Sequence, residues 1–211
     1  VLSVLSGEMP GQLIGSAPEA NYILIRSEDA NSEQIIEEYN WAAAAELADS
    51  LGADIINSSL GYYLYDAPWQ SHSYLSMDGK TTPAAKAANF AGSKGILVVS
   101  SAGNEGSTEW RHIINPADAL NALGIGAVNG NGEYVYFSSI GPSADGRIKP
   151  DVVAMGSRVV AQITNGQFAG VNGTSFSAPL VAGLAACLWQ SNPSLTVKEV
   201  AQRIIRSSNS Y

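Results

Sequence analysis

The sequence predicts a single α/β domain over residues 1–211, with a three-layer architecture in which helices cover both faces of a mostly parallel sheet. Two observations predict this class. Short apolar runs alternate with longer alanine-rich segments of helical periodicity, the order of elements that builds a parallel α/β sheet. A chain of 211 residues with 45% hydrophobic content is also long enough to bury one large core.

The first half of the chain alternates between strand and helix patterns. The expected elements are a helical end at 1–5, a strand at 21–29, a helix at 31–52, a strand at 53–61, a helix at 81–95 and a strand at 96–106. Asn31 or Ser32 suits the N-cap of the first long helix, and Gly52 follows its last turn. Pro83 suits the first turn of the next helix, which we expect to end at Gly95.

In the second half the strands come closer together before two closing helices. The expected elements are strands at 123–128, 134–140 and 157–164, then helices at 175–191 and 196–207. A turn at Asn131 and Gly132 separates the first two strands. Cys187, the only cysteine, lies inside the alanine-rich helix, so we expect a buried and unreactive thiol.

The charge balance narrows the classes of partner. Eleven basic residues against 19 acidic ones give a formal net charge of -8 and a pI of about 4.6. Negative charge repels phosphate backbones and anionic lipid surfaces, so we expect neither nucleic acid nor a membrane as partner. The sequence also contains no apolar run of 18 or more residues, the length that a membrane-spanning helix needs.

The run VNGTSFSAPLVAG, residues 171–183, contains a serine in a position that suits a nucleophile. Ser175 falls at the start of an expected helix, where unpaired N–H groups and the helix dipole stabilise an anion. A plain N-cap serine is the alternative interpretation. The GxSxG elbow of α/β-hydrolases is absent because Ser177 occupies the position of its second glycine. Ser175 is therefore the candidate nucleophile, on some other fold than an α/β-hydrolase.

The segment GTSFSAP, residues 173–179, resembles the nucleophile signature of the subtilisin-like serine proteases, or subtilases, and implies Ser175 as nucleophile. SSAGNEG, residues 100–106, resembles the loop in which that family carries its second oxyanion donor, which places this role on Asn104. The run FSSIGPSADGRIKPDVVAMG is also similar to the subtilase stretch before the nucleophile, with Met155 where the family commonly has proline in a structural turn. The resemblance spans nearly the whole chain and implies a subtilisin-like fold.

The resemblance also implies a peptide-binding cleft. NSSLG, residues 57–61, is similar to the family's substrate-binding strand, which pairs with an extended peptide. One wall of the primary specificity pocket would then consist of Ser59, Leu60 and Gly61, and the opposite wall of Ser101, Ala102 and Gly103. By spacing back from Pro116 and Ala117, Ile114 falls near the pocket floor, or else points into the core. The implied partner is a peptide or protein substrate.

Two motifs of the family do not appear. Subtilases carry an aspartate motif and then an HGTxV histidine motif before the segments found here, and VLSVLSG looks like the continuation of the histidine helix. Neither His72 nor His112 matches a catalytic position of the family. We therefore expect residues 1–211 to be the C-terminal major part of a subtilisin-like peptidase domain that acts as a serine endopeptidase. The triad Asp and His would come from an upstream segment of the same protein. That segment is the second expected partner, besides the substrate.

The alternative is a non-catalytic subtilase relative that keeps the cleft and binds peptides without cleaving them. Secretion, or export to the periplasm, is an expectation from the family alone. No cofactor and no metal site is expected, because carboxylates such as Glu28, Asp29 and Asp151 show no clustered ligand spacing. Calcium is the one cation that the family resemblance leaves open.

Overall fold

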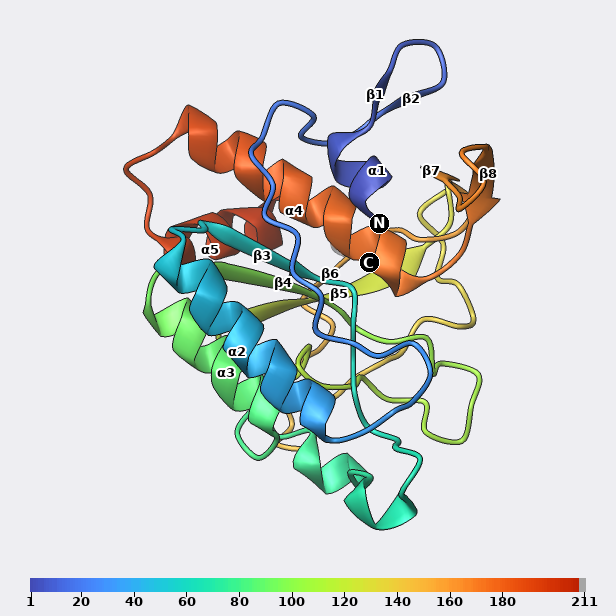
Figure 1. Cartoon of the computed structure of the whole chain (residues 1–211), viewed down its shortest axis with the longest axis vertical. Helices are drawn as coiled ribbons and strands as arrows, with labels where there is room; N and C mark the ends of the chain where they lie inside the picture. The colour runs from blue at the N-terminus through green and yellow to red at the C-terminus, as the bar shows by residue number, and fades with distance from the viewer. Residues whose placement is uncertain (209–211) are drawn as a thin grey trace.

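The computed structural model describes residues 1–208. Its centre is a four-stranded parallel sheet in the order β3-β4-β5-β6. The strands are β3 (Ile55–Ser58), β4 (Leu97–Ser101), β5 (Ala122–Val128) and β6 (Val152–Met155). All five residues of β4 are buried, as expected for a central strand of a parallel sheet that is covered on both faces. The predicted α/β class is confirmed (Figure 1).

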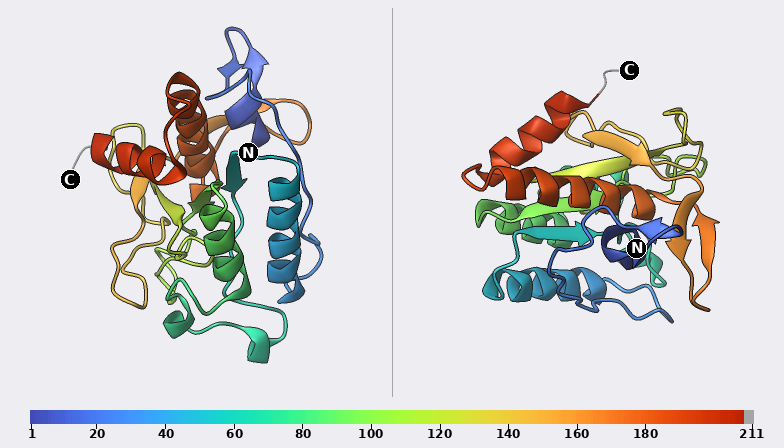
Figure 2. Two further views of the ribbon diagram at one scale, coloured as in Figure 1. Left: turned by 90° about the vertical axis from the view of Figure 1, so that its left-hand side faces the viewer. Right: turned by 90° about the horizontal axis from the view of Figure 1, so that it is seen from above.

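Two helices cover one face of this sheet and two lie on the other side (Figure 2). The first pair is α2 (Ile36–Ser50) and α3 (Pro83–Ser93), the second α4 (Thr174–Ser191) and α5 (Val197–Ser207). Successive β4 side chains alternate between the two cores: Val98 packs with α2 and α3, and Val99 packs with α4. The three predicted layers therefore follow from the alternation of side chains along each strand.

The helix ends show why these segments are helical. Thr82 caps α3 by accepting a hydrogen bond from the Ala85 amide, and Pro83 occupies the first turn as predicted. Thr196 and Glu199 form a reciprocal capping box at the start of α5. Alanines on α4 bring that helix close to the sheet, because small side chains allow a short distance between backbones.

Shorter elements surround the sheet. They are α1 (Leu2–Ser6), β1 (Glu8–Met9), β2 (Leu13–Ile14), the short 3-10 helices η1 (Pro68–Gln70) and η2 (Tyr74–Ser76), β7 (Val159–Gln162) and β8 (Phe168–Val171). β7 and β8 form an antiparallel hairpin, and β1 and β2 form another. The loop that carries the serine motif therefore follows a hairpin strand, and not a strand of the central sheet.

Two predicted strands are wrong. Residues 21–29 form an extended segment without ladder partners, and Ile23 and Leu24 are exposed to 46% and 72%. Residues 134–140 make isolated bridges at Tyr134 and Ile140 but no continuous strand. A short apolar run forms a strand only when a neighbouring strand supplies the hydrogen-bond ladder, and neither segment has one among residues 1–208.

Three smaller expectations also need correction. The first long helix begins at Ile36 and not at Asn31 or Ser32. The Glu37 carboxylate accepts hydrogen bonds from the amides of Asp29 and Gln34, and these bonds hold the preceding turn in a non-helical conformation. Met155 is the last residue of β6, paired with Val128, and does not lie in a turn. Cys187 is exposed, because its position on α4 faces away from the sheet.

Candidate active site

Ser175 is the second residue of α4, and the helix begins directly after Gly173, which has φ 144°. That φ favours glycine, and it lets the chain turn sharply from the β8 end into the helix. Among residues 1–208 the Ser175 amide donates no hydrogen bond. This N–H is one of the unpaired donors of a helix N-terminus, so it is available to an anion placed beside the hydroxyl.

Asn104, on the loop after β4, is fixed against the same helix end. Its Oδ1 accepts hydrogen bonds from the Thr174 amide at 2.9 Å and from the Thr174 hydroxyl at 3.2 Å. The Thr174 hydroxyl also lies 3.2 Å from both the N and the O of Gly103. Since the carbonyl end of the amide is occupied, the Asn104 NH₂ group is left to donate elsewhere. The structure thus brings Ser175 and Asn104 together through Thr174, which sequence reasoning did not single out.

The predicted substrate-binding residues meet at one pocket of about 280 Å³. Its lining includes Ser59, Leu60, Gly61, Ser101, Gly103, Asn104, Ile114 and Ser175. Ala102 is the exception: it is fully buried and does not line the pocket. Its side chain points away because alternate residues of an extended chain face opposite sides. Of the residues named for the site from the sequence, all but one therefore surround a common space.

Ile114 lies between the two walls of this pocket. A Cβ added to Gly61 would stand 2.5 Å from the Ile114 Cδ1, and one added to Gly103 would stand 3.0 Å from the same atom. Of the two positions left open by the sequence, the structure therefore favours the pocket, with Ile114 as the side chain that fills the space between the walls. Its backbone amide also bonds to Ala102 at 3.1 Å, which ties the floor to the second wall.

Four further residues line the same pocket: Glu33, Tyr63, Leu64 and Glu105. Glu105 accepts a hydrogen bond from the Tyr63 hydroxyl at 2.9 Å. Burial and this bond raise the pKa of Tyr63 to about 12, so the phenol stays a donor. Glu33 enters from the segment before α2, and partial burial together with the charges of Glu37 and Glu28 raises its pKa. The pocket therefore has an acidic rim, which a sequence without spatial neighbours does not reveal.

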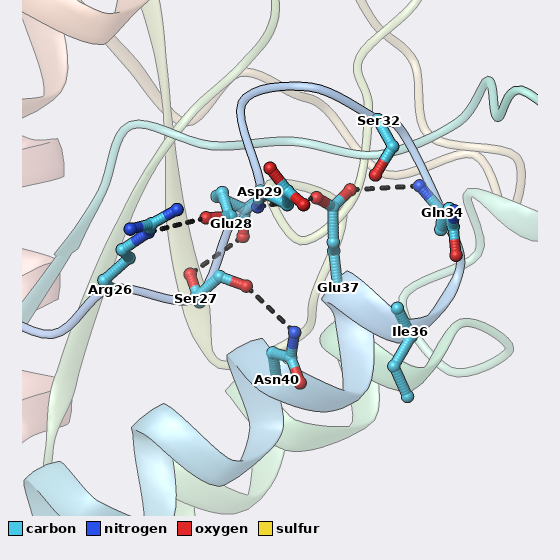
Figure 3. Close-up of a pocket in the computed structure, with 9 residues that line it drawn as sticks. All are labelled: Arg26, Ser27, Glu28, Asp29, Ser32, Gln34, Ile36, Glu37 and Asn40. Atoms are coloured by element: carbon cyan, nitrogen blue, oxygen red, sulfur yellow. Dashed lines mark hydrogen bonds between the residues drawn. The ribbon is translucent and has the colours of Figure 1, made fainter.

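A second pocket, of about 440 Å³, lies between the segment 26–29 and the start of α2 (Figure 3). The Glu37 carboxylate points into it and takes amides from Asp29 and Gln34, each at 3.1 Å. Asn40 donates to the Ser27 carbonyl at 3.0 Å. Its lining does not include Ser175 or Asn104. These contacts hold residues 26–29 against α2, so the polar side chains of this pocket are explained by their role in packing.

Neither histidine is the hydrogen-bond partner of Ser175. His72 bonds through Nε2 to the fully buried carboxylate of Glu38, which also accepts from the Tyr65 hydroxyl. His112 stacks on Tyr74, with ring centroids 4.1 Å apart. The Ser175 Oγ instead lies 3.3 Å from the carbonyl oxygen of Ser59. Within residues 1–208, Ser175 therefore has no imidazole beside it that would take its proton.

No group of three or more His, Cys, Asp or Glu side chains in residues 1–208 is arranged to hold a metal ion. Over the same range, every helix is too short or too polar to cross a membrane.

Comparison with known proteins agrees with the geometry. The model of the Subtilase family matches residues 4–211. The thermophilic serine proteinase of Bacillus sp. strain AK1 is 34% identical over 83% of this chain and 37% of its own length. Subtilisin NAT of Bacillus subtilis subsp. natto is 30% identical over 91% of this chain and 45% of its own length.

Among solved structures, the self-cleaved protease domain of PatA superposes with a TM-score of 0.80 at 23% identity, over 99% of this chain and 73% of that one. This likeness shows the shared fold. The chain spans less than half the length of the two sequence relatives above. With a family model that matches nearly all of its residues, the chain belongs to the Subtilase family.

Proposed function

We propose that the chain is the major C-terminal part of the catalytic domain of a serine endopeptidase. The observation that carries the proposal is the meeting of the Ser175 hydroxyl, the free Ser175 amide and the anchored Asn104 amide at one pocket. The Ser175 Oγ would attack a peptide carbonyl carbon while a base takes its proton. The amide of Ser175 and the NH₂ of Asn104 would donate to the resulting oxyanion. The amine would leave with a proton, and water would then hydrolyse the acyl-enzyme.

The substrate would bind as an added strand. Among residues 1–208 the amides of Leu60 and Gly61 donate no hydrogen bond, although they follow directly on β3. Unpaired amides at the end of an extended segment are suited to an extended peptide. Next along the chain, the Tyr62 amide and carbonyl are both bonded to Asn115, at 2.8 and 2.7 Å, which fixes the end of this wall.

The base and its orienting carboxylate would come from the sequence that precedes Val1. One feature of the fold supports such a partner: β3 pairs with β4 alone, and its other edge has no neighbour among the described residues. The extended segment 21–29, with Ile23 and Leu24 exposed, likewise has no ladder partner in that range. A strand from the upstream segment would form backbone hydrogen bonds with the free edge of β3 or with residues 21–29. Export from the cell, and catalysis without cofactor, nucleic acid or membrane, are further parts of this proposal.

The test is to express residues 1–211 with and without the natural sequence that precedes Val1, and to assay hydrolysis of fluorogenic peptides. We expect activity only with that sequence present, because a serine without a base keeps only a small rate over water. Equal turnover from residues 1–211 alone would contradict the proposed base. Peptide binding without any hydrolysis by the longer protein would favour the non-catalytic alternative.

A further inference from the structure

Asn57, in β3, is the start of a chain of hydrogen bonds that ends at Ser175. Its Nδ2 lies 3.3 Å from the Ser59 Oγ. The Ser59 Oγ in turn donates to the Ser175 carbonyl oxygen at 2.8 Å. β3 and the first turn of α4 are thus linked through one side-chain amide and one hydroxyl, although Ser59 and Ser175 are 116 positions apart in the sequence.

The direction of these bonds is determined by the hydroxyl. A serine hydroxyl has one proton, and Ser59 gives it to the Ser175 carbonyl. Its oxygen can then only accept, so the neighbouring amide must present N–H and not C=O. If the Asn57 amide were turned over, two acceptors would face each other. The Ser59 hydroxyl therefore fixes the orientation of the Asn57 side chain.

The other end of the Asn57 amide shows that this orientation has a cost. Its Oδ1 is buried and has no hydrogen-bond partner among residues 1–208. A buried acceptor without a donor destabilises a fold, and a leucine of similar shape would avoid that cost. An amide at this position therefore does not stabilise the fold through its oxygen. Its Nδ2 instead contacts the Ser59 hydroxyl, which is bonded to Ser175.

We propose that Asn57 is a positioning residue for the reaction, acting through Ser59 to hold Ser175 in register with the pocket wall. The inference rests on the proposed function, because it requires Ser175 to be the nucleophile. The wall itself does not depend on Asn57, since the β3–β4 ladder and the Tyr62–Asn115 pair hold its backbone. Loss of the amide should therefore disturb the nucleophile more than the binding of substrate.

The experiment uses the protein with its preceding sequence and compares Asn57→Leu and Asn57→Asp with wild type. Both variants keep the approximate shape, and neither can donate to the Ser59 hydroxyl when the aspartate is ionised. We expect kcat to fall ~10- to 100-fold, the effect of a small misplacement of a reacting group. KM should change less than threefold. The rate of labelling by an organophosphonate should fall with kcat.

Ser58→Ala is the matched control, because Ser58 is the next residue of β3 but its hydroxyl accepts from Trp41 Nε1 on the opposite face. It should lower the melting temperature and leave kcat near the wild-type value. Asn57→Leu should do the reverse, lowering kcat with little loss of melting temperature. If Asn57→Leu does not fold, Asn57→Asp provides the same comparison.

A double-mutant cycle with Ser59→Ala tests the pathway. Once the Ser59 hydroxyl is gone, Asn57→Leu should have no further effect on kcat, because residues that act through one bond are not additive. Wild-type kcat in both Asn57 variants, or full additivity with Ser59→Ala, would overturn the positioning role while leaving the proposed function intact. An inactive wild type that is also not labelled would refute the proposed function itself.

Discussion

Ser59 and Ser175 are joined by two hydrogen bonds in opposite directions. The Ser59 Oγ donates to the Ser175 carbonyl at 2.8 Å, and the Ser175 Oγ lies 3.3 Å from the Ser59 carbonyl. The pair fixes the start of α4 against the end of β3, where the pocket wall begins. In this arrangement the acceptor of the Ser175 hydroxyl is the neutral carbonyl oxygen of Ser59. A carbonyl cannot take a proton at neutral pH, so the pair positions Ser175 without activating it.

Replacing Asn104 by alanine should lower kcat by ~10²- to 10³-fold, because its NH₂ group would meet full negative charge only in the transition state. That magnitude is the one established for removing such a donor from a subtilisin, and is not an independent result. Steady-state kinetics with the active protein measures it. Asn129→Ala, in an exposed turn, is the control. A raised KM with unchanged kcat would instead assign Asn104 to ground-state binding.

Replacing Ile114 by glycine should enlarge the pocket between Gly61 and Gly103. The Ile114 side chain fills the space between Gly61 and Gly103, so the wild type should prefer small or medium apolar side chains. The variant should gain at least ~10-fold in kcat/KM for phenylalanine relative to alanine at that subsite. A fluorogenic peptide series measures both. A strong aromatic preference in the wild type would show that Ile114 does not limit the pocket.

The free energy of unfolding should vary with pH through the protonation of the buried Asp118 carboxyl. Burial raises the pKa of this carboxyl from 3.8 to about 6. A group whose pKa is higher in the folded state contributes stability below its unfolded pKa, about 4, and that contribution is lost as pH rises through about 6. Asp118→Asn should therefore stabilise the protein at pH 7.5 by up to ~3 kcal/mol, and much less at pH 4. Its amide oxygen can still accept from the Gly79 amide, as the carboxylate does at 2.7 Å.

Denaturant unfolding at the two pH values checks this prediction. If wild type and Asp118→Asn differ by the same free energy of unfolding at pH 4 and pH 7.5, the carboxyl does not titrate in this interval.

Alkylation of Cys187 should leave activity unchanged. The thiol is exposed, so iodoacetamide should reach it. It lies 12 residues after Ser175 on the same helix, which is a distance of about 18 Å along the axis. Mass spectrometry measures modification and a peptide assay measures turnover, with Cys187→Ser as the unreactive control. Loss of activity in step with alkylation would place Cys187 closer to the chemistry than its position on α4 implies.

Much of the fold could be predicted from local patterns. The α3 boundary follows from Thr82 and Pro83, and the α5 start from Thr196 and Glu199, because caps act within one helical turn. Residues 21–29 could not be assigned in this way. Their short apolar run is typical of a buried strand, but a strand also needs a neighbour, and no property of the segment itself reports whether one is present.

The site shows the same division. The motifs around Ser175 and Asn104 carry their residues to one pocket, as predicted from the sequence. Asn57 and Thr174 do not stand out in the sequence, because Asn57 acts through the contact of Ser59 with Ser175, 116 positions away, and Thr174 contacts Asn104 across 70 positions. Asn57 left a weak signal, a polar residue inside the apolar run ADIINSSLG. The burial of Ala102 and the exposure of Cys187 likewise depend on the direction of one side chain.

The central claim, that Ser175 is the nucleophile of a serine peptidase, is tested most directly by covalent labelling. The protein with its preceding sequence is treated with an organophosphonate, and the modified peptide is identified by tandem mass spectrometry. We predict one label, on Ser175, that is absent from Ser175→Ala and retained in Ser177→Ala, whose serine is fully buried. A label that persists in Ser175→Ala, or that maps to another residue, would contradict the account.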